Sequence, residues 1–93
     1  MPGVRFEWDE AKAAANVQKH GVAFEEAATA LRDPLAATGY DPDHAADEDR
    51  FVSFGVSADG RLLAVAHAEH GEVVRIISAR RASRPERTIY EEG

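Results

Sequence analysis

The sequence predicts an α+β fold, in which a small, mostly antiparallel sheet is covered by helices. Helical periodicity is confined to residues 10–20, 24–33 and 84–92, and short apolar runs with strand-like composition lie before and between these segments. The dipeptides Asp59-Gly60 and His70-Gly71 separate the last three of these runs, which is typical of antiparallel hairpins.

The first third of the chain predicts one strand and two helices. Residues 4–8, VRFEW, have strand composition, and Asp9 can cap the helix that follows, which Gly21 ends. The second helix carries apolar residues at helical spacing and ends before Pro34. We expect the two helices to form a hairpin that packs on one face of the sheet.

Four more strands are expected, at residues 35–40, 50–57, 62–69 and 72–81, and a short helix over 84–92 follows them. If both glycine dipeptides form two-residue loops, one face of the last three strands is uniformly apolar and forms the core. This core face consists of Val52, Phe54, Val56, Leu63, Val65, Val74 and Ile76.

The opposite face of these strands carries Arg75 among small residues, namely Ser53, Gly55, Ala64, Ala66 and Ala79. Such residues leave a shallow floor on which an extended anion fits. They also suit close packing of a helix, and both interpretations stay open. The same register pairs Arg50 with Glu69, and a one-residue slip in either turn would exchange the two faces.

The composition, with 44% hydrophobic and 30% charged residues, is that of an ordinary globular domain. The 93 residues support one domain, 1–93, because a second core would need roughly another hundred residues. The absence of cysteine excludes disulfides, thiolate metal sites and cysteine nucleophiles. No apolar run approaches the roughly 20 residues of a membrane span and the N-terminus lacks signal-peptide features, so we expect a cytoplasmic protein without membrane contact.

Charge is unevenly distributed along the chain, whose formal net charge is −6. Residues 1–50 contain five Lys/Arg and eleven Asp/Glu, whereas residues 51–93 contain six of each. Within that neutral half, five arginines lie between Arg75 and Arg87 with a single acid, Glu86. Such a cluster favours contact with a polyanion, although surface arginines are more often simply solvated.

The segment DPDHAADED, residues 41–49, contains five acids and His44. It lacks the glycine and the bidentate acid at the spacing of a calcium loop, so it predicts a solvated acidic loop. We therefore expect no metal site and no cofactor.

Several separated motifs resemble the BrnT family of bacterial toxins. They are FEWDEAKAAANVQKHGVAFEEA, DPLAATGYDPDH, DEDRFVSFGVSADGRLLAVAH and RIISARRASRPERTIYE, which together cover nearly the whole chain. The most distinctive parts are Trp8-Asp9, Lys12, Asn16, Lys19-His20-Gly21 and the run from Arg75 to Arg80. Their number and their order make the resemblance more specific than one short pattern would be.

The resemblance implies a RelE-like fold and a ribonuclease toxin of a type II toxin–antitoxin system, which inhibits growth by cutting RNA. It also implies a BrnA-like antitoxin that neutralises the toxin and carries a ribbon-helix-helix part, so that operator DNA is reached only through the antitoxin. We therefore expect a metal-independent endoribonuclease acting on RNA, whose 2′-OH serves as the nucleophile.

Cations and histidines of these motifs are the candidate site residues. Arg75 is the first choice for phosphate stabilisation, because a guanidinium matches phosphate oxygens and an arginine within a central strand is unusual. The catalytic candidates are Arg75, His67, His20, Lys19, Arg50 and Arg80. The structural alternatives are an internal ion pair for Arg75, a core histidine for His67 and a helix-end residue for His20.

The RNA-binding candidates are Lys12, Arg81, Arg84 and Arg87. Lys12, Asn16 and His20 recur at i, i+4 and i+8, which places a polar strip on one side of the first helix. Such a strip is usually the solvated side of an amphipathic helix.

Three departures from the family pattern support an alternative function. Ala68 and His70 stand where the pattern has threonine and arginine, and Asp49 stands where it has glutamate. The alternative is a catalytically weak module that binds an antitoxin and modulates operon repression. A direct nucleic-acid regulator is a third hypothesis, against which the net charge and the lack of a groove-reading helix argue.

Overall fold

The computed structural model describes residues 3–41 and 49–93, which contain five strands in one sheet and three helices. The strands are β1 (Arg5–Glu7), β2 (Ala37–Tyr40), β3 (Arg50–Val56), β4 (Leu62–His70) and β5 (Val73–Arg81). The helices are α1 (Glu10–His20), α2 (Phe24–Leu31) and α3 (Arg84–Glu92). The strand order is β1-β5-β4-β3-β2, with only the β1–β5 pair parallel within this described part. The predicted α+β class and mostly antiparallel sheet are confirmed.

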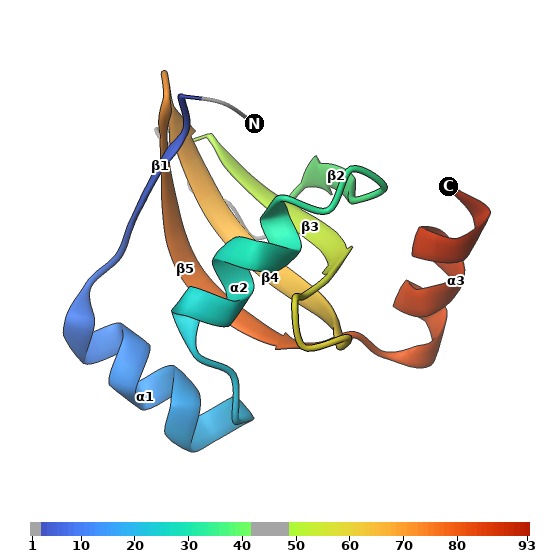
Figure 1. Cartoon of the computed structure of the whole chain (residues 1–93), viewed down its shortest axis with the longest axis horizontal. Helices are drawn as coiled ribbons and strands as arrows, with labels where there is room; N and C mark the ends of the chain where they lie inside the picture. Colours follow the sequence, from blue (N-terminus) through green and yellow to red (C-terminus); the bar gives the residue numbers. More distant parts are fainter. Residues whose placement is uncertain (1–2, 42–48) are drawn as a thin grey trace.

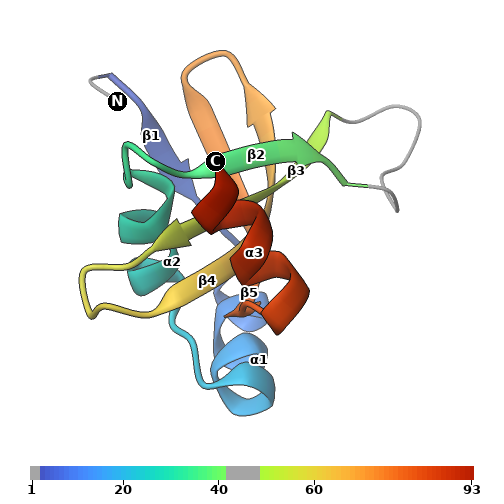
Figure 2. The ribbon, with the colours of Figure 1, turned by 90° about the vertical axis from the view of Figure 1, so that its right-hand side faces the viewer.

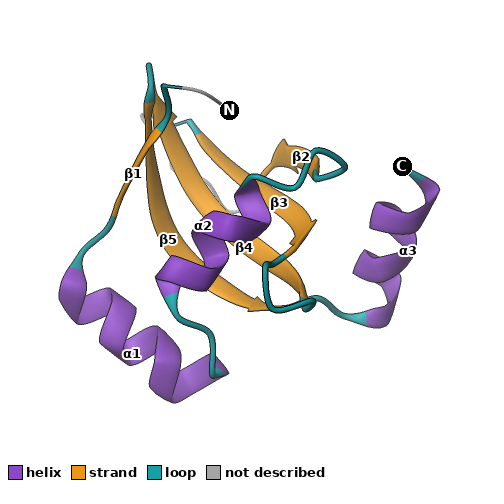
Figure 3. Ribbon diagram, viewed as in Figure 1, coloured by secondary structure: helices purple, strands orange, loops and turns teal. Residues whose placement is uncertain are grey.

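Helices lie on both sides of the sheet. Helix α2 packs against β3, β4 and β5, and α1 lies beside β5 (Figure 1). Helix α3 packs on the opposite face, against β3 (Figure 2). In Figure 3, α2 crosses in front of the strands and α3 lies to the right of β3 and β2. Because α1 and α2 make their main contacts with the sheet, the expected packing of these helices as a hairpin is not confirmed.

The core lies between α2 and the sheet. Phe24 is fully buried and meets the Trp8 ring edge-on, with the ring centroids 6.0 Å apart. Burying side chains of this size stabilises the fold by roughly 2 kcal/mol each. The buried cluster consists of Val22, Phe24, Ala27, Ala30, Leu63, Val65, Ile76 and Ala79.

The loop between β3 and β4 is one residue longer than predicted. Ser57 N–H donates to the Arg61 carbonyl over 2.8 Å, and Val56 pairs with Leu62. The loop residue Gly60 adopts a positive φ of 82°, which only glycine adopts without strain. The extra loop residue shifts the pairing of β3 with β4 by one residue, which exchanges the two faces of β3. The core prediction for this strand is therefore wrong. The residues that face α2 are Phe51, Ser53 and Gly55, and those that face away from it are Val52, Phe54 and Val56.

Strand β5 contains a bulge that the sequence did not predict. Ser78 pairs with Ala66 and Ile76 pairs with His67, so Ile77 is an extra residue without a partner in the ladder. The bulge turns Ala79 toward α2, where it is buried, instead of toward the face that carries Arg75.

The hairpin between β4 and β5 also differs from the prediction, but without changing faces. Its loop is Gly71-Glu72, because His70 pairs with Val73. This moves the pairing by two residues, so Val74 and Ile76 face the helices as predicted. Arg50 pairs with Ala68 and not with Glu69.

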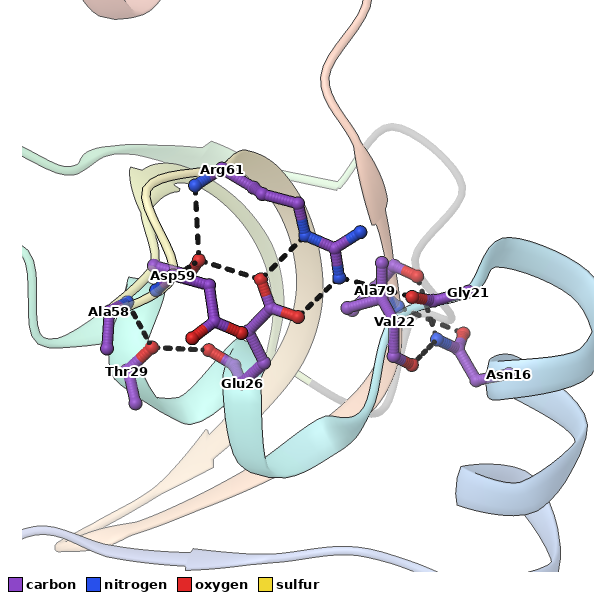
Figure 4. A network of polar contacts seen from close by, with 10 residues as sticks. Asn16, Gly21, Val22, Glu26, Thr29, Ala58, Asp59, Arg61 and Ala79 are labelled. Carbon is purple, nitrogen blue, oxygen red and sulfur yellow. Dashed lines mark hydrogen bonds and ion pairs between the residues drawn. The ribbon is translucent and has the colours of Figure 1, made fainter.

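Helix α1 is held to the sheet by Asn16, its single buried residue. The side-chain amide of Asn16 donates to the carbonyls of Val22 and Ala79, both over 2.8 Å, and its oxygen accepts the N–H of Ala79 over 3.1 Å (Figure 4). We call this arrangement the Asn16 clamp. The prediction that Asn16 belongs to a solvated strip on α1 is therefore wrong.

The loop between β3 and β4 is tied to α2 by an ion pair. Arg61 donates to the carboxylate of Glu26, with Nε 2.9 Å from Oε2, and to the Gly21 carbonyl over 3.1 Å (Figure 4). Ser57 donates to the same carboxylate over 2.7 Å. The hydrogen bond from Arg61 is the main reason why the pKa of Glu26 is below its usual value.

Asn16→Ala should destabilise the protein by roughly 2–4 kcal/mol, because it leaves two buried carbonyls and one buried N–H without their partner. Urea unfolding at neutral pH measures this loss. The matched control is Gln18→Ala, an exposed site on the same helix, which should stay within about 0.5 kcal/mol of wild type. Equal effects of both substitutions would contradict the clamp.

Gly55→Ala should also destabilise the protein, by about 1–3 kcal/mol, because its Cβ would lie 2.3 Å from the Ala30 carbonyl oxygen. Strand and helix would have to move apart to accommodate the methyl group. Gly39→Ala is the control in the same sheet, where a Cβ meets nothing within 4 Å. Thermal unfolding should separate the two variants, and a neutral Gly55→Ala would show that α2 and β3 can separate at little cost.

Candidate functional site

A pocket of about 220 Å³ opens where the start of α1 meets the sheet. We call it the basic pocket. Its lining consists of Asp9, Lys12, Arg50, Arg75, Ile76 and Ile77. Of the candidate site residues, the structure therefore brings together Lys12, Arg50 and Arg75.

Sheet register brings the two arginines of the basic pocket together. Arg50 on β3 and Arg75 on β5 both pair with Ala68 on the strand between them. Since Ile76 belongs to the core below α2, its neighbour Arg75 faces the other side of the sheet, as does Arg50. Ala68 is fully buried and its methyl group leaves space between the two long side chains.

Helix α1 contributes the other charged residues of the pocket. Asp9 caps the helix, with Oδ1 accepting the backbone N–H of Lys12 over 3.1 Å. Lys12 is exposed, and its ammonium makes no ion pair with the residues that the structure describes. The cap thus fixes the carboxylate, and the first turn places the lysine over the same pocket.

Among the described residues that line the basic pocket, three cations face one carboxylate, which favours binding of an anion. Arg50 Nη2 lies 3.8 Å from the nearest Asp41 carboxylate oxygen, which is longer than a hydrogen bond. Its Nε is buried and finds no hydrogen-bond acceptor in residues 3–41 and 49–93. Guanidinium groups present fixed pairs of donors that match the oxygens of a phosphate group.

His67 lies on the other face of the sheet, 2% exposed, and does not line the basic pocket. Its Nε2 is 2.8 Å from Ser53 Oγ, which is 2.7 Å from Thr38 Oγ1, and its ring stacks on Phe51. His67, Ser53 and Thr38 border a separate cavity of about 60 Å³ below the end of α2. The structural alternative, a core histidine, describes this position.

Burial lowers the pKa of His67 to about 4. The carboxylate of Glu69 is 3.2 Å from Nδ1 and favours the charged ring, but without the geometry of a hydrogen bond. That carboxylate is also 39% exposed and screened by water, so the effect of burial dominates. The ring is therefore neutral at pH 7.

His20 and Lys19 lie at the far end of α1. His20 is eight positions after Lys12, which is about 12 Å along a helix axis. Neither residue lines the basic pocket. Both are in the last turn, where a cation interacts favourably with the helix dipole.

The four C-terminal arginines do not line the basic pocket either. Arg80 donates two hydrogen bonds, of 2.7 and 2.8 Å, to Glu86, and these bonds lower the pKa of Glu86 to about 2. Arg81 lies close enough to Glu26 to lower its pKa slightly. Arg84 and Arg87 are exposed on α3, where Arg87 is 3.9 Å from Glu91. The arginine cluster seen in the sequence is thus divided between several surroundings.

Among the described residues of the pocket, Asp9 is the one charged residue that the sequence predicts only as a helix cap. A carboxylate one helical turn before Lys12 was the available signal. The predicted acidic loop lies mostly outside the described residues, with its histidine, His44. Within the described part, no group of His, Asp and Glu could hold a metal ion, and no helix is long and apolar enough to cross a membrane.

Comparisons with known proteins bear on the family and the fold of this chain. Residues 8–86 match the family model described as ribonuclease toxin, BrnT, of type II toxin–antitoxin system. The fold is similar to the 1.1 Å crystal structure of the Brucella abortus ribonuclease toxin BrnT, with a TM-score of 0.62 and 27% sequence identity. That match covers 87% of this chain and 99% of the Brucella chain. A search of the curated proteins found no match.

Acid should destabilise the fold through His67. Its pKa is about 4 in the folded protein and about 6.5 when unfolded, so between these values the unfolded state binds more protons. Stability from this residue is complete above pH 6.5 and is lost as the pH falls to 4, by up to roughly 3 kcal/mol. Urea unfolding from pH 7 to 4.5 measures it. His67→Gln should remove most of this dependence, and an unchanged slope would assign it to other groups.

Proposed function

Because the chain belongs to the BrnT family of ribonuclease toxins of type II toxin–antitoxin systems, we propose that it cuts RNA at the basic pocket. The proposed reaction is metal-independent endonucleolytic cleavage, in which the RNA 2′-OH attacks the adjacent phosphorus. Growth inhibition follows from loss of RNA in the cytoplasm. The RelE-like classification of the fold is part of this proposal.

One observation carries the proposal: Lys12, Arg50 and Arg75 come from three separate elements and line one pocket. Cleavage by 2′-OH attack passes through a phosphorane whose oxygens carry extra negative charge. Cations held in place before the reaction stabilise that charge without a cost of reorganisation. No cofactor is required for this chemistry.

We assign Arg75 and Arg50 to the phosphorane oxygens, and Lys12 to the phosphate as well. His67, His20, Lys19 and Arg80 were catalytic candidates that do not line the pocket. Their proposed roles are structural: His67 lies in the core, His20 and Lys19 lie at the end of α1, and Arg80 pairs with Glu86. Arg81, Arg84 and Arg87 are proposed to contact RNA only outside the pocket.

Membership of a type II system implies an antitoxin partner. We propose that this partner is BrnA-like, with a ribbon-helix-helix part through which operator DNA is bound. A second candidate function is a catalytically weak module that binds the antitoxin and modulates repression. Ala68 favours it, because the residue between Arg50 and Arg75 has no hydroxyl group to offer the substrate.

Arg75→Ala should lower RNA cleavage by roughly 100-fold or more, the usual loss when one donor to a developing oxyanion is removed. The measurement is incubation of purified protein with RNA in EDTA, followed by end-group analysis. Fragments should carry 2′,3′-cyclic or 3′-phosphate ends. Arg32→Ala is the control, since Arg32 lies over the Phe6 ring and outside the pocket.

The two candidate functions give different results in that experiment. Folded wild-type protein that binds its antitoxin but cuts no RNA would support the binding module. Cleavage that stops in EDTA and returns with a divalent ion would contradict the metal-independent mechanism. Equal loss of cleavage in Arg75→Ala and Arg32→Ala would show that the activity does not depend on the basic pocket.

A further inference from the structure

We propose that Asp9 and Lys12 are the acid–base pair of the basic pocket: Asp9 accepts the 2′-OH proton and Lys12 donates a proton to the leaving 5′-oxygen. This inference rests on the proposed function, in which the pocket holds an RNA phosphodiester. It adds a base that the sequence did not suggest, and it changes the role of Lys12 from binding to proton donation.

The need for a base follows from the rest of the lining. Arginine remains protonated and accepts no proton, so Arg50 and Arg75 stabilise charge but cannot activate a hydroxyl group. His67 is buried on the other face of the sheet, and His20 lies two turns beyond the pocket. Among the described residues that line the pocket, Asp9 is the one carboxylate.

Asp9 is oriented as a base by its capping role. Its Oδ1 accepts the Lys12 N–H, which holds the carboxylate at the rim of the pocket. Its Oδ2 makes no hydrogen bond or ion pair with residues in the described part of the chain. One oxygen therefore fixes the group while the other remains available to a substrate hydroxyl.

Lys12 is suited to the opposite task. Among the described residues of the lining it is the only ammonium, and an ammonium can give up a proton where a guanidinium cannot. It stands three residues after Asp9, so the same helical turn carries both groups. Placing acid and base on one turn keeps their separation fixed while RNA binds.

Each proton that moves in this reaction has a named donor and a named acceptor. The 2′-OH proton moves to Asp9 Oδ2 as the 2′-oxygen bonds to phosphorus. The bond from phosphorus to the 5′-oxygen breaks, and that oxygen takes a proton from Lys12 Nζ. The products are a 2′,3′-cyclic phosphate and a free 5′-OH, and exchange with water restores the charges of both side chains.

Asp9→Asn tests the base without disturbing the helix, because asparagine caps a helix as well as aspartate does. Cleavage of an RNA oligonucleotide should fall by roughly 100-fold or more in kcat, with KM little changed. Binding of the same oligonucleotide with a 2′-deoxy scissile residue should be unchanged or tighter, since a negative charge has left an anion site. A purely structural role for Asp9 would instead weaken binding of the oligonucleotide together with its cleavage.

Glu10→Gln is the matched control. It removes one negative charge from the adjacent residue of the same first turn, and Glu10 does not line the pocket. We expect wild-type cleavage from this variant. Asp9→Ser also retains a capping side chain, so it repeats the test if Asp9→Asn unfolds.

Lys12→Arg tests the acid. It retains the positive charge and should bind the deoxy oligonucleotide within a few-fold of wild type, but it should cleave at least about 10-fold more slowly because arginine gives up no proton. Wild-type protein that cleaves while Asp9→Asn cleaves within threefold of it would overturn the pair and leave the proposed function standing. Wild-type protein that cuts no RNA would overturn the proposed function itself.

Discussion

The Asn16 clamp is the interaction on which the rest of the arrangement depends. Helix α1 has a single buried residue, and that residue makes three hydrogen bonds that join the helix to Ala79 of β5 and to the start of the next segment at Val22. A buried amide with all these bonds made fixes position in a way that apolar contact alone does not. Because α1 is one continuous helix capped by Asp9, the clamp also determines where Asp9 and Lys12, toward its other end, lie relative to Arg75.

The bulge in β5 supports the same arrangement from the sheet side. The extra residue at Ile77 lets Ile76 and Ala79 both face α2. Ala79 can then meet Asn16, while Arg75 remains on the opposite face beside Arg50. Bulges often alter the direction of side chains near functional sites. Here one irregularity serves both the attachment of α1 and the lining of the basic pocket.

In this protein, the local charge of a site depends more on which residues form ion pairs than on the net charge of the sequence segment. The acidic surplus of the first half does not exclude a basic pocket, since Lys12 and Arg50 belong to that half. Conversely, Arg80 of the arginine cluster is held by Glu86, the single acid within that cluster, and Arg87 lies near Glu91. Local charge at the pocket is therefore not given by the net charge of the segments that build it.

The sequence by itself determined the elements. Helices 10–20 and 84–92 were predicted at the residues where they occur, because caps and periodicity are local properties. It also gave the α+β class and named Lys12, Arg50 and Arg75. Tertiary structure alone decided the faces: one additional loop residue before β4 reversed β3, and a bulge turned Ala79 inward. It also decided that His67 is buried, that Asn16 is a clamp and that Asp9 lies beside three cations, because each depends on contacts between residues far apart in the chain.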